Sequence, residues 1–410
     1  MDSLPEKPLP PSATPPVTAP MPDLSGITVL QLVPSLEAGG AERTAIDVAA
    51  ALVQAGARAL VATTGGRLVR ELDEAGGVWV PFPAATKNPV EVIWNAERIR
   101  RLALKENVSL IHARSRAPAW SGLMAARRLG VPFVTTYHGA YKKGGGLKNW
   151  YNSVMARGDA VIANSRFTAD LIKARHPQAQ GNVSVIYRGT DLSKFDAGTI
   201  SADRVAALRS AWGVPDGRRI VLLAARLTRW KGQEVLIDAA EQLVKGGLED
   251  VDFVLAGDAQ GRIDYETGLT DRIARAGLQD VVRIVGHCED MPAADRVADI
   301  VTVPSIEPEA FGRSAVEAQA VGTPVVVSNL GAVPETVLAP PDVAEGDRTG
   351  WRVPAGDAGA LADAIRAALD LTGPQRAALS DRARSHVRAT FTLEAMTSAT
   401  LRIYADLLRR

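Results

Sequence analysis

Short apolar segments alternate with segments of helical periodicity along almost the whole chain, and this alternation limits the fold more than any other feature. Segments with helical spacing, among them 41–53, 90–104 and 167–174, separate apolar runs in the first half. These strand-like runs lie at 27–33, 59–62, 109–112, 132–136, 160–163 and 183–186. Because alternating strands and helices form parallel sheets with helices on both faces, we predict a doubly wound α/β domain.

The same alternation starts again after a break at residues 196–217. A helical stretch occupies 233–244, among strand-like runs at 220–224, 252–256, 281–285, 300–303 and 323–327. We therefore predict two Rossmann-like domains, 25–196 and 197–388, followed by a helical segment at 389–410. Ligands of open parallel sheets bind at the carboxyl ends of the strands, so two such domains predict a binding cleft between them.

Length and composition fit this arrangement, because 410 residues are enough for two hydrophobic cores. The formal net charge of +1 gives no sign of a nucleic-acid partner, and the single cysteine, Cys288, excludes an internal disulfide. Residues 1–24 are rich in proline and lack the pattern of a signal peptide, so we predict a disordered leader. No apolar run is long enough to span a bilayer. We expect a cytoplasmic protein, free or peripheral on the inner face of the cytoplasmic membrane.

Charge is unevenly distributed between the two halves. Residues 25–196 contain 22 Lys and Arg against 13 Asp and Glu, whereas residues 197–410 contain 24 against 30. A basic half joined to an acidic half suggests that the first half meets an anionic partner. The alternative is a chance imbalance on solvated helices.

The segment 304–327, P-S-I-E-P-E-A-F-G-R-S-A-V-E-A-Q-A-V-G-T-P-V-V-V, predicts a strand end, a tight loop, a helix and a further strand. Its two acidic residues, Glu309 and Glu317, have an E-x7-E spacing that places one in the loop and the other about two turns into the helix. The backbone amides of Ala310, Phe311 and Gly312 lie at the expected helix start, which suits an anionic or hydroxyl-rich ligand. The alternative is an ordinary strand-helix unit with two surface glutamates.

Two cations follow the first strand of the second half, in A-A-R-L-T-R-W-K-G-Q. Arg226 and Lys231 lie in a strand-to-helix loop just before a helix, which is a natural clamp for a diphosphate. Arg229, between them, is expected to face solvent. Read alone, the pair would be interpreted as two solvated loop cations, and the E-x7-E motif in the same domain favours the clamp.

Together these motifs closely resemble glycosyltransferase family 4, the retaining glycosyltransferases of the GT-B fold. The resemblance implies that Glu309 faces the donor sugar, that Glu317 holds the nucleotide ribose, and that Arg226 and Lys231 bind the donor diphosphate. It also implies that the final helix packs back on the first domain. A nucleotide-diphosphate sugar would be the co-substrate, with no other cofactor and no metal. Whether Glu309 is a nucleophile or only a positioning group stays open.

The resemblance also assigns residues in the first half. His138, which ends the strand F-V-T-T-Y, would lie beside the donor sugar as a catalytic residue. Gly40 would approach the donor phosphates and Gly39 the acceptor, in a glycine-rich loop after the first strand. His112 is expected on the acceptor side. Arg188 stands where many relatives have asparagine, and an arginine there suits a phosphate or a carboxylate.

The segment Y-K-K-G-G-G-L-K-N-W-Y, residues 141–151, combines lysines with aromatic residues. Lys142 and Lys143, with Lys148 and Trp150, could dock on an anionic membrane leaflet on the acceptor side. The alternative is a solvated loop that leads into a helix with a buried tryptophan.

Two further patterns are interpreted as structural. Asp250 and Asp252 form a D-x-D pair at the expected amino end of a strand, and we predict a solvated strand edge rather than a metal site. His176 and His386 are predicted to be surface residues.

The sequence therefore predicts a retaining hexosyltransferase that moves a sugar from a nucleotide sugar to a glycan or lipid-linked acceptor. The basic first half favours a bacterial surface polysaccharide such as lipopolysaccharide core. Rival functions are a disaccharide synthase with a small acceptor, a sugar-nucleotide epimerase, or a non-catalytic sugar-nucleotide binder. The donor base, the sugar, the acceptor and the oligomeric state are not readable from the sequence.

Overall fold

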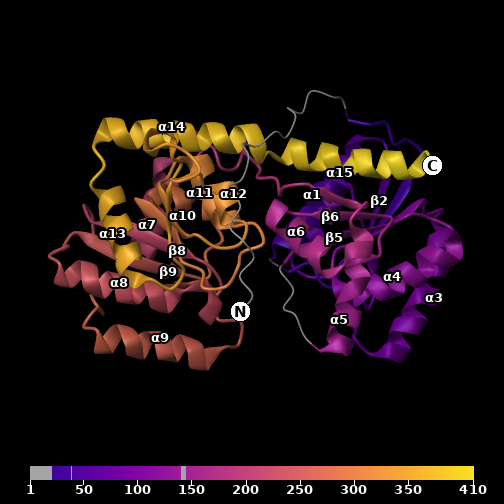
Figure 1. Ribbon diagram of the computed structural model, residues 1–410, viewed down its shortest axis with the longest axis horizontal. Helices are drawn as coiled ribbons and strands as arrows, with labels where there is room; N and C mark the ends of the chain where they lie inside the picture. Colours follow the sequence, from indigo (N-terminus) through magenta and orange to yellow (C-terminus); the bar gives the residue numbers. More distant parts are fainter. Residues whose placement is uncertain (1–20, 38, 140–144) are drawn as a thin grey trace. The chain divides into compact units, whose positions relative to one another are not determined.

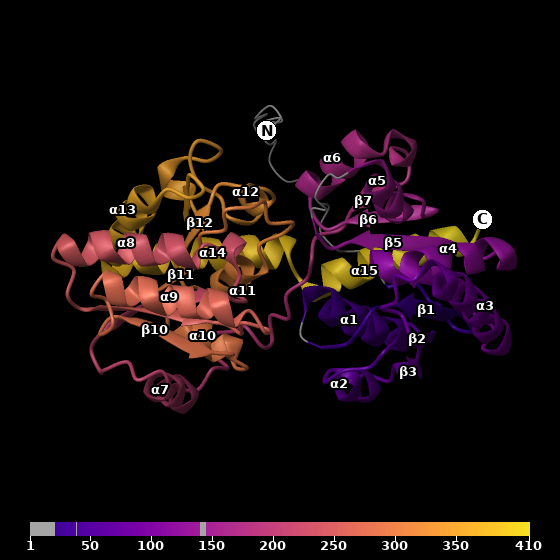
Figure 2. The same cartoon turned by 90° about the horizontal axis from the view of Figure 1, so that it is seen from below.

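The computed structural model describes residues 21–37, 39–139 and 145–410. Contacts divide the chain into two compact units. The first unit comprises the described residues up to Gly189 together with Leu393–Arg410, and the second comprises Thr190–Thr392. Each unit is a parallel sheet with helices on both faces (Figures 1 and 2), which confirms the predicted α/β fold class.

Within the described residues, the sheet of the first unit has seven strands in the order β3-β2-β1-β4-β5-β6-β7. The strands are β1 (Thr28–Leu32), β2 (Arg58–Thr63), β3 (Val78–Pro81), β4 (Leu110–Ala113), β5 (Phe133–Tyr137), β6 (Ala160–Ala163) and β7 (Val183–Val185). The helices are α1 (Gly40–Gln54), α2 (Val69–Glu74), α3 (Pro89–Lys105), α4 (Arg116–Leu129), α5 (Gly146–Asn152), α6 (Arg166–Arg175) and α15 (Leu393–Leu408). Two short 3₁₀ helices are η1 (Ser153–Ala156) and η2 (Pro177–Ala179).

The core of the first unit has two layers because successive residues of a strand point to opposite faces of the sheet. Val29 packs into one hydrophobic cluster and Leu30 into the other. Helix α15 lies beside α1 (Figure 1) and places Tyr404 in the cluster that contains Val29. Leu24 is buried in the same cluster, so the ordered domain begins before residue 25, the predicted start. The rest of the predicted leader, apart from residues 21–23, lies outside the described residues.

The second unit, over the same described part of the chain, has a six-stranded sheet in the order β10-β9-β8-β11-β12-β13. The strands are β8 (Arg219–Ala224), β9 (Val251–Ala256), β10 (Val282–Gly286), β11 (Ile300–Val303), β12 (Val325–Ser328) and β13 (Trp351–Val353). The helices are α7 (Ala202–Ala211), η3 (Arg229–Lys231), α8 (Gln233–Lys245), α9 (Ile263–Arg275), α10 (Met291–Val297), α11 (Arg313–Val321), α12 (Val333–Thr336), η4 (Glu345–Asp347), α13 (Ala358–Leu369) and α14 (Gly373–Thr390).

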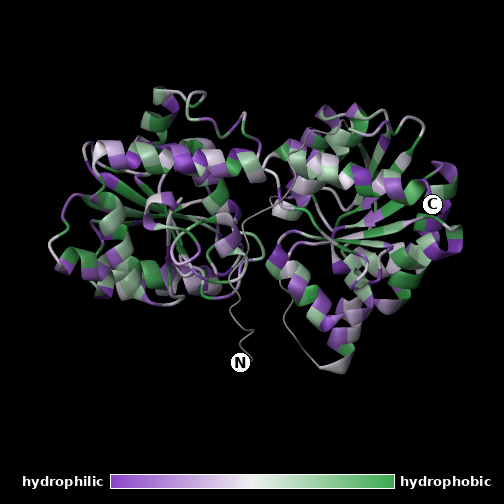
Figure 3. Ribbon diagram, turned by 45° about the horizontal axis from the view of Figure 1, so that its top comes forward, coloured by the Kyte–Doolittle hydropathy of each residue, from purple (hydrophilic) through white to green (hydrophobic). Residues whose placement is uncertain are grey.

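The central strands of the second unit are apolar on both faces, as expected for a parallel sheet that is covered on both sides. Val221 and Leu222 of β8 enter different hydrophobic clusters. Figure 3 shows hydrophobic residues along the strands, whereas the helices carry alternating hydrophilic and hydrophobic stripes. Strands β8 and β11 pair directly, with Ile300 opposite Val221. The loops that follow their carboxyl ends therefore emerge side by side.

Two predictions about single side chains are wrong. Asp252 is not a solvated strand edge, because its side chain is fully buried and pairs with Arg283 at 2.7 Å and with Arg218. His386 is not a surface residue, because its ring is largely buried 5.2 Å from the ring of Phe391, and burial lowers its pKa to about 4. In both cases tertiary packing covers a residue whose polarity suggested exposure.

A search for membrane-crossing helices among the described residues found none of sufficient length and apolarity.

Candidate active site

The loop after β8 carries the two predicted phosphate-binding cations. Arg226 is exposed, and Lys231 ends the 3₁₀ helix directly before α8. Gly232 joins these two helices with a φ of 78°, and an added Cβ atom would lie 1.9 Å from the carbonyl oxygen of Pro304. A glycine is therefore needed here for both backbone conformation and space. It lets the Lys231 loop pack against the loop that follows β11.

Lys231 meets Glu309 across these two loops. The Lys231 Nζ donates to Glu309 Oε1 at 2.5 Å, and Ser305 Oγ donates to the same oxygen at 2.7 Å. Glu309 is only 9% exposed, so its charge is largely removed from water. A buried carboxylate needs such charge and hydrogen-bond partners to offset the cost of removing it from water. The predicted diphosphate cation and the predicted sugar-facing carboxylate thus form one cluster in the second unit.

Gly331 holds the backbone of Glu309 in place. It forms a β-bridge with Glu309, and the Ala332 N–H donates to the Glu309 carbonyl at 2.8 Å. Gly331 has a φ of 71°, and an added Cβ atom would lie 2.4 Å from the same carbonyl oxygen. The sequence analysis missed this residue, since it is 22 positions away and nothing in the local pattern joins it to Glu309.

Glu317 lies on α11, which begins after Gly312 at a φ of 86°. It is 5% exposed, and its Oε1 accepts from Arg313 Nε at 2.5 Å. The E-x7-E spacing therefore does place one carboxylate in the loop and the other on the helix. A carboxylate with one charged partner keeps further lone pairs for ligand hydroxyl groups.

A third carboxyl group, Asp295 on α10, lies in the interior behind this helix. It is completely buried, and neither of its oxygens has a hydrogen-bond partner among the described residues. Burial, followed by the nearby charge of Glu317, raises the pKa of Asp295 well above its usual 3.8. Sequence reasoning missed this residue because a single aspartate on a short helix carries no pattern.

The loop residues Ala310, Phe311 and Gly312 lie between the two glutamates. The ring of Phe311 is buried, 5.5 Å edge-on from the ring of Phe391. This contact anchors the loop to the interior of the second unit. The aromatic side chain thus has a structural role, and only the backbone at this point is left to face a ligand.

In the first unit, Arg188 and Gly40 come together at the start of α1. An added Cβ atom at Gly40 would lie 2.2 Å from the Arg188 NH1 nitrogen, so the guanidinium rests against the first turn of the helix. Gly39 precedes the helix, and the Glu42 carboxylate folds over it, 2.0 Å from where a Cβ would be. A cation and helix amides therefore share this corner with one carboxylate.

His138 contacts the same guanidinium. Arg188 NH2 lies 3.0 Å from His138 Nδ1, and because a guanidinium only donates, Nδ1 is the acceptor. Burial, followed by the charges of Arg188 and Arg114, holds the pKa of His138 well below its usual 6.5. The neutral ring therefore carries its proton on Nε2. That nitrogen is buried without a hydrogen-bond partner among the described residues.

His112 does not line the acceptor side as expected. It is completely buried, with Nδ1 2.6 Å from Tyr404 Oη and Nε2 2.7 Å from Thr136 Oγ1. Both ring nitrogens are therefore occupied by protein hydroxyl groups. The physical reason is the last helix, α15, which brings Tyr404 against the strand that ends near His112. His112 joins this helix to the sheet.

The predicted acceptor-side lysines Lys142 and Lys143 lie outside the described residues. Their neighbour Trp150, on α5, is 56% exposed, and its ring stacks on Trp120 with centroids 4.4 Å apart. The alternative prediction, a helix that begins with a buried tryptophan, is therefore wrong.

Comparisons with known proteins agree with this architecture. The family described as Glycosyltransferase Family 4 matches residues 38–194, and Glycosyl transferases group 1 matches residues 205–386. A D-inositol 3-phosphate glycosyltransferase of Xylanimonas cellulosilytica is 30% identical over 403 residues, which cover 91% of this chain and 93% of the relative.

Two solved structures are similar along almost their whole length. A glycosyltransferase from Rickettsia africae is 32% identical, with a TM-score of 0.84 and coverage of 94% of this chain and 99% of that one. Anabaena HepE in complex with UDP and glucose is 26% identical, with a TM-score of 0.79 and coverage of 92% and 99%. With two matching family descriptions and a relative aligned over nearly its full length, the chain belongs to glycosyltransferase family 4, the GT-B glycosyltransferases that use nucleotide sugars.

Proposed function

We propose that this protein transfers a hexose from a UDP-sugar, with retention of anomeric configuration, to a hydroxyl group of a phosphorylated polyol or sugar. The observation that carries the proposal is the cluster of Lys231, Glu309 and Ser305 beside the helix that bears Glu317. The donor assignment draws on the similarity to HepE, whose structure contains UDP and glucose.

The donor roles follow from charge and position. Arg226 and Lys231 neutralise the diphosphate as the glycosidic bond breaks, which needs no metal ion. Arg226 is exposed and has no carboxylate partner among the described residues, so it is available to a phosphate. Lys231 exchanges its contact with Glu309 for the diphosphate, which frees Glu309 for the sugar hydroxyl groups. Glu317 accepts from the ribose hydroxyl groups.

The acceptor assignment rests on the first unit. Arg188, at the start of α1, supplies a cation for an acceptor phosphate or carboxylate, and His138 Nε2 supplies a neutral donor. The relative from Xylanimonas cellulosilytica is named for a phosphorylated inositol acceptor, which agrees with an anionic small acceptor.

A second candidate acceptor is a lipid-linked surface glycan at an anionic membrane. It is favoured by exposed apolar residues on two helices of the first unit, Ile93 and Trp94 on α3 and Leu147 and Trp150 on α5. Helix α4 lies between them, because its Ser121 Oγ donates to the Val92 carbonyl at 2.9 Å and its Trp120 stacks on Trp150. Aromatic residues of this kind suit a membrane interface. Lipopolysaccharide core, the acceptor expected from the sequence, would be of this class.

The decisive experiment is a binding and turnover panel of UDP-, GDP- and ADP-sugars with the wild type, Glu317→Gln and Lys231→Met. We expect one UDP-sugar to bind, and its affinity to fall at least ~10-fold in both variants, as loss of a charged hydrogen bond implies. Offering soluble polyol phosphates and lipid-linked acceptors in vesicles then separates the two acceptor classes. The anomeric proton of the product reports retention by NMR.

Folded wild type that binds none of these donors would contradict the proposal and favour a non-catalytic role. Interconversion of the donor sugar without transfer would favour an epimerase.

Gly331→Ala tests how the Glu309 loop is positioned. We expect transfer to fall about 10²-fold or more, because an added methyl group must displace Glu309 by pushing on its carbonyl, and small misplacements of reacting groups are that costly. Gly277→Ala is the matched control, since its φ of 69° is nearly the same but nothing lies within 4 Å of an added Cβ. Initial rates and unfolding midpoints are compared, and equal rates for the two variants would refute the positioning role.

A further inference from the structure

A cavity of about 560 Å³ opens at the amino edge of the sheet in the second unit. It is lined by residues at the starts of β8, β11 and β12, including Arg219, Asp299 and Pro324, and by residues of α7 and α14. The loops that carry Lys231 and Glu309 leave the same sheet at its carboxyl edge. The cavity and the candidate donor site are thus at opposite ends of the strands, and a ligand in one cannot touch the other.

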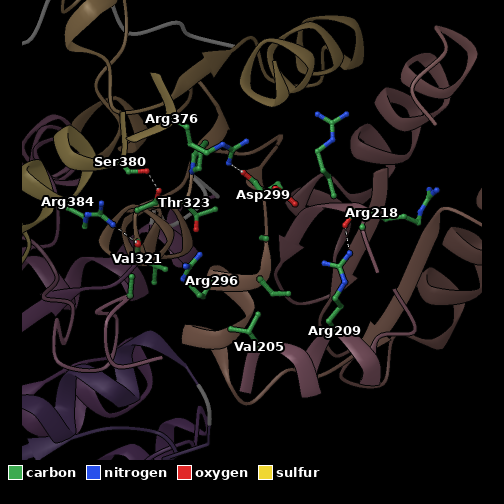
Figure 4. Close-up of a pocket in the computed structure, with 17 residues that line it drawn as sticks. Val205, Arg209, Arg218, Arg296, Asp299, Val321, Thr323, Arg376, Ser380 and Arg384 are labelled. Carbon is green, nitrogen blue, oxygen red and sulfur yellow. Dashed lines mark hydrogen bonds between the residues drawn. The ribbon is translucent and has the colours of Figure 1, made fainter. Parts of the chain in front are cut away.

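Arginine dominates the lining of this cavity, as Figure 4 shows. The arginines are Arg209, Arg218, Arg219, Arg296, Arg376 and Arg384, and among the described lining residues the only carboxylate is Asp299. This concentration is unusual for its surroundings, because residues 197–410 contain 24 Lys and Arg against 30 Asp and Glu. An electropositive cavity in an acidic half of the chain favours a negatively charged ligand.

Two of the arginines keep their charge without a carboxylate partner in the described structure. Arg296 is exposed and makes no hydrogen bond or ion pair with any described residue. Arg376 donates only to backbone carbonyls, to that of Asp299 at 2.9 Å and that of Ala368. The Asp299 carboxylate forms no ion pair with either arginine in the described structure, and its Oδ2 accepts from the Ile220 N–H at 2.8 Å.

A third arginine, Arg209, is only weakly neutralised. It donates to the Pro215 carbonyl at 2.8 Å and to the Arg218 carbonyl, whereas the carboxylate of Asp216 is 3.9 Å away and fully exposed to solvent. An exposed pair at this distance contributes little. The backbone contacts pre-arrange the guanidinium while leaving its charge available.

The other three arginines have carboxylate partners. Arg218 pairs with Asp252, Arg219 with Asp250 and Arg384 with Asp381. Even so, the Nε of Arg219 is buried without a hydrogen-bond partner among the described residues. These three side chains are therefore more fully neutralised than Arg296 and Arg376.

We propose that this cavity is a second anion site, which binds a phosphorylated group independently of the donor site. Guanidinium groups match phosphate oxygens with paired hydrogen bonds, and the volume suits a diphosphate or a sugar phosphate. The ligand touches none of the residues assigned to the reaction, so it acts as an effector or as a second contact with a phosphorylated partner molecule. The inference does not depend on the identity of the transferred sugar.

The test is calorimetric titration of the full chain with inorganic pyrophosphate. Arg296→Gln is the first variant because Arg296 has no partner among the described residues, so its loss leaves the fold intact. We expect it to weaken one class of pyrophosphate sites roughly 10-fold or more, and Arg296→Gln combined with Arg376→Gln to abolish that class. Lys231→Met is expected to leave this class unchanged.

The matched control is Arg275→Gln, on α9 and outside the cavity, which should bind pyrophosphate like the wild type. A parallel experiment measures binding to phosphatidylglycerol vesicles. If the wild type binds vesicles but not pyrophosphate, and the double variant loses vesicle binding, the phosphate belongs to a lipid headgroup. Pyrophosphate and vesicle binding that are both unaffected by the double variant would overturn the proposal, provided that its unfolding midpoint shows a folded protein.

Discussion

Lys231→Met is expected to lower the turnover number by roughly 10²–10³-fold, the usual effect of removing one group that stabilises developing negative charge. Lys231 Nζ lies 2.5 Å from Glu309 Oε1, and in the proposed function it passes from this carboxylate to the donor diphosphate. The substitution is also expected to destabilise the protein, by about 3–5 kcal/mol, because Glu309 is 9% exposed and would lose its counter-charge.

These two effects can be separated by a second substitution. Lys231→Met combined with Glu309→Gln removes both charges, so the unfolding midpoint should recover while turnover stays low. Lys245→Met is the matched control, since its Nζ also lies 2.6 Å from a glutamate, Glu241, but its side chain is 72% exposed. An exposed pair of this kind is worth less than about 1 kcal/mol. Full turnover in Lys231→Met would exclude the diphosphate role.

Acidification from pH 7 to pH 5 is expected to lower the free energy of unfolding. Burial holds the pKa of His112 and of His138 well below 6.5 and lowers the pKa of His386 to about 4. Below pH 6.5 these histidines bind protons in the unfolded chain but stay neutral in the folded protein. The free energy of unfolding therefore falls as the pH falls. Each histidine contributes about 1.4 kcal/mol per pH unit until its folded pKa is reached.

Asp295 acts in the opposite direction. Its pKa is raised well above 3.8, so the folded protein holds a proton that the unfolded chain has released, and this cost to stability shrinks as the pH falls. Denaturant titrations at pH 7, 6 and 5 measure the sum of these effects. His386→Gln should remove about one third of the histidine slope, and an identical slope in this variant and the wild type would show that His386 does not titrate as its burial implies. Above pH 7.5 the histidine effect should vanish.

The local pattern of the chain was enough to predict the α/β class and the placement of Glu309 and Glu317, because both depend on short-range regularities. Apolar runs of strand length separated by helical spacing lead to parallel sheets, and eight positions of separation across a helix start place one residue in a loop and the other on a helix. Lys231 was predicted from its position before a helix, and its contact with Glu309 then arises because β8 and β11 are neighbours in the sheet.

Contacts between distant segments were not predictable in this way. His112 appeared exposed to a ligand, yet Tyr404 covers it from a helix 292 positions later in the chain. Asp252 appeared solvated, yet Arg218 and Arg283 enclose it. In each case a single polar residue forms no sequence pattern that would indicate burial. Whether it is buried depends on which distant side chains pack against it in the folded protein.

The sequence by itself determined which strands and helices form and on which of them the charged motif residues lie. It could do so because propensity, periodicity and motif spacing act over a few turns or strands. The tertiary structure alone decided that Gly331 constrains Glu309, that Asp295 is buried behind α11, and that six arginines spread from residue 209 to residue 384 line one cavity. The physical reason is that packing and burial depend on the distances in space between residues that are far apart in the chain. Sheet order and helix packing set these distances only when the whole unit has folded.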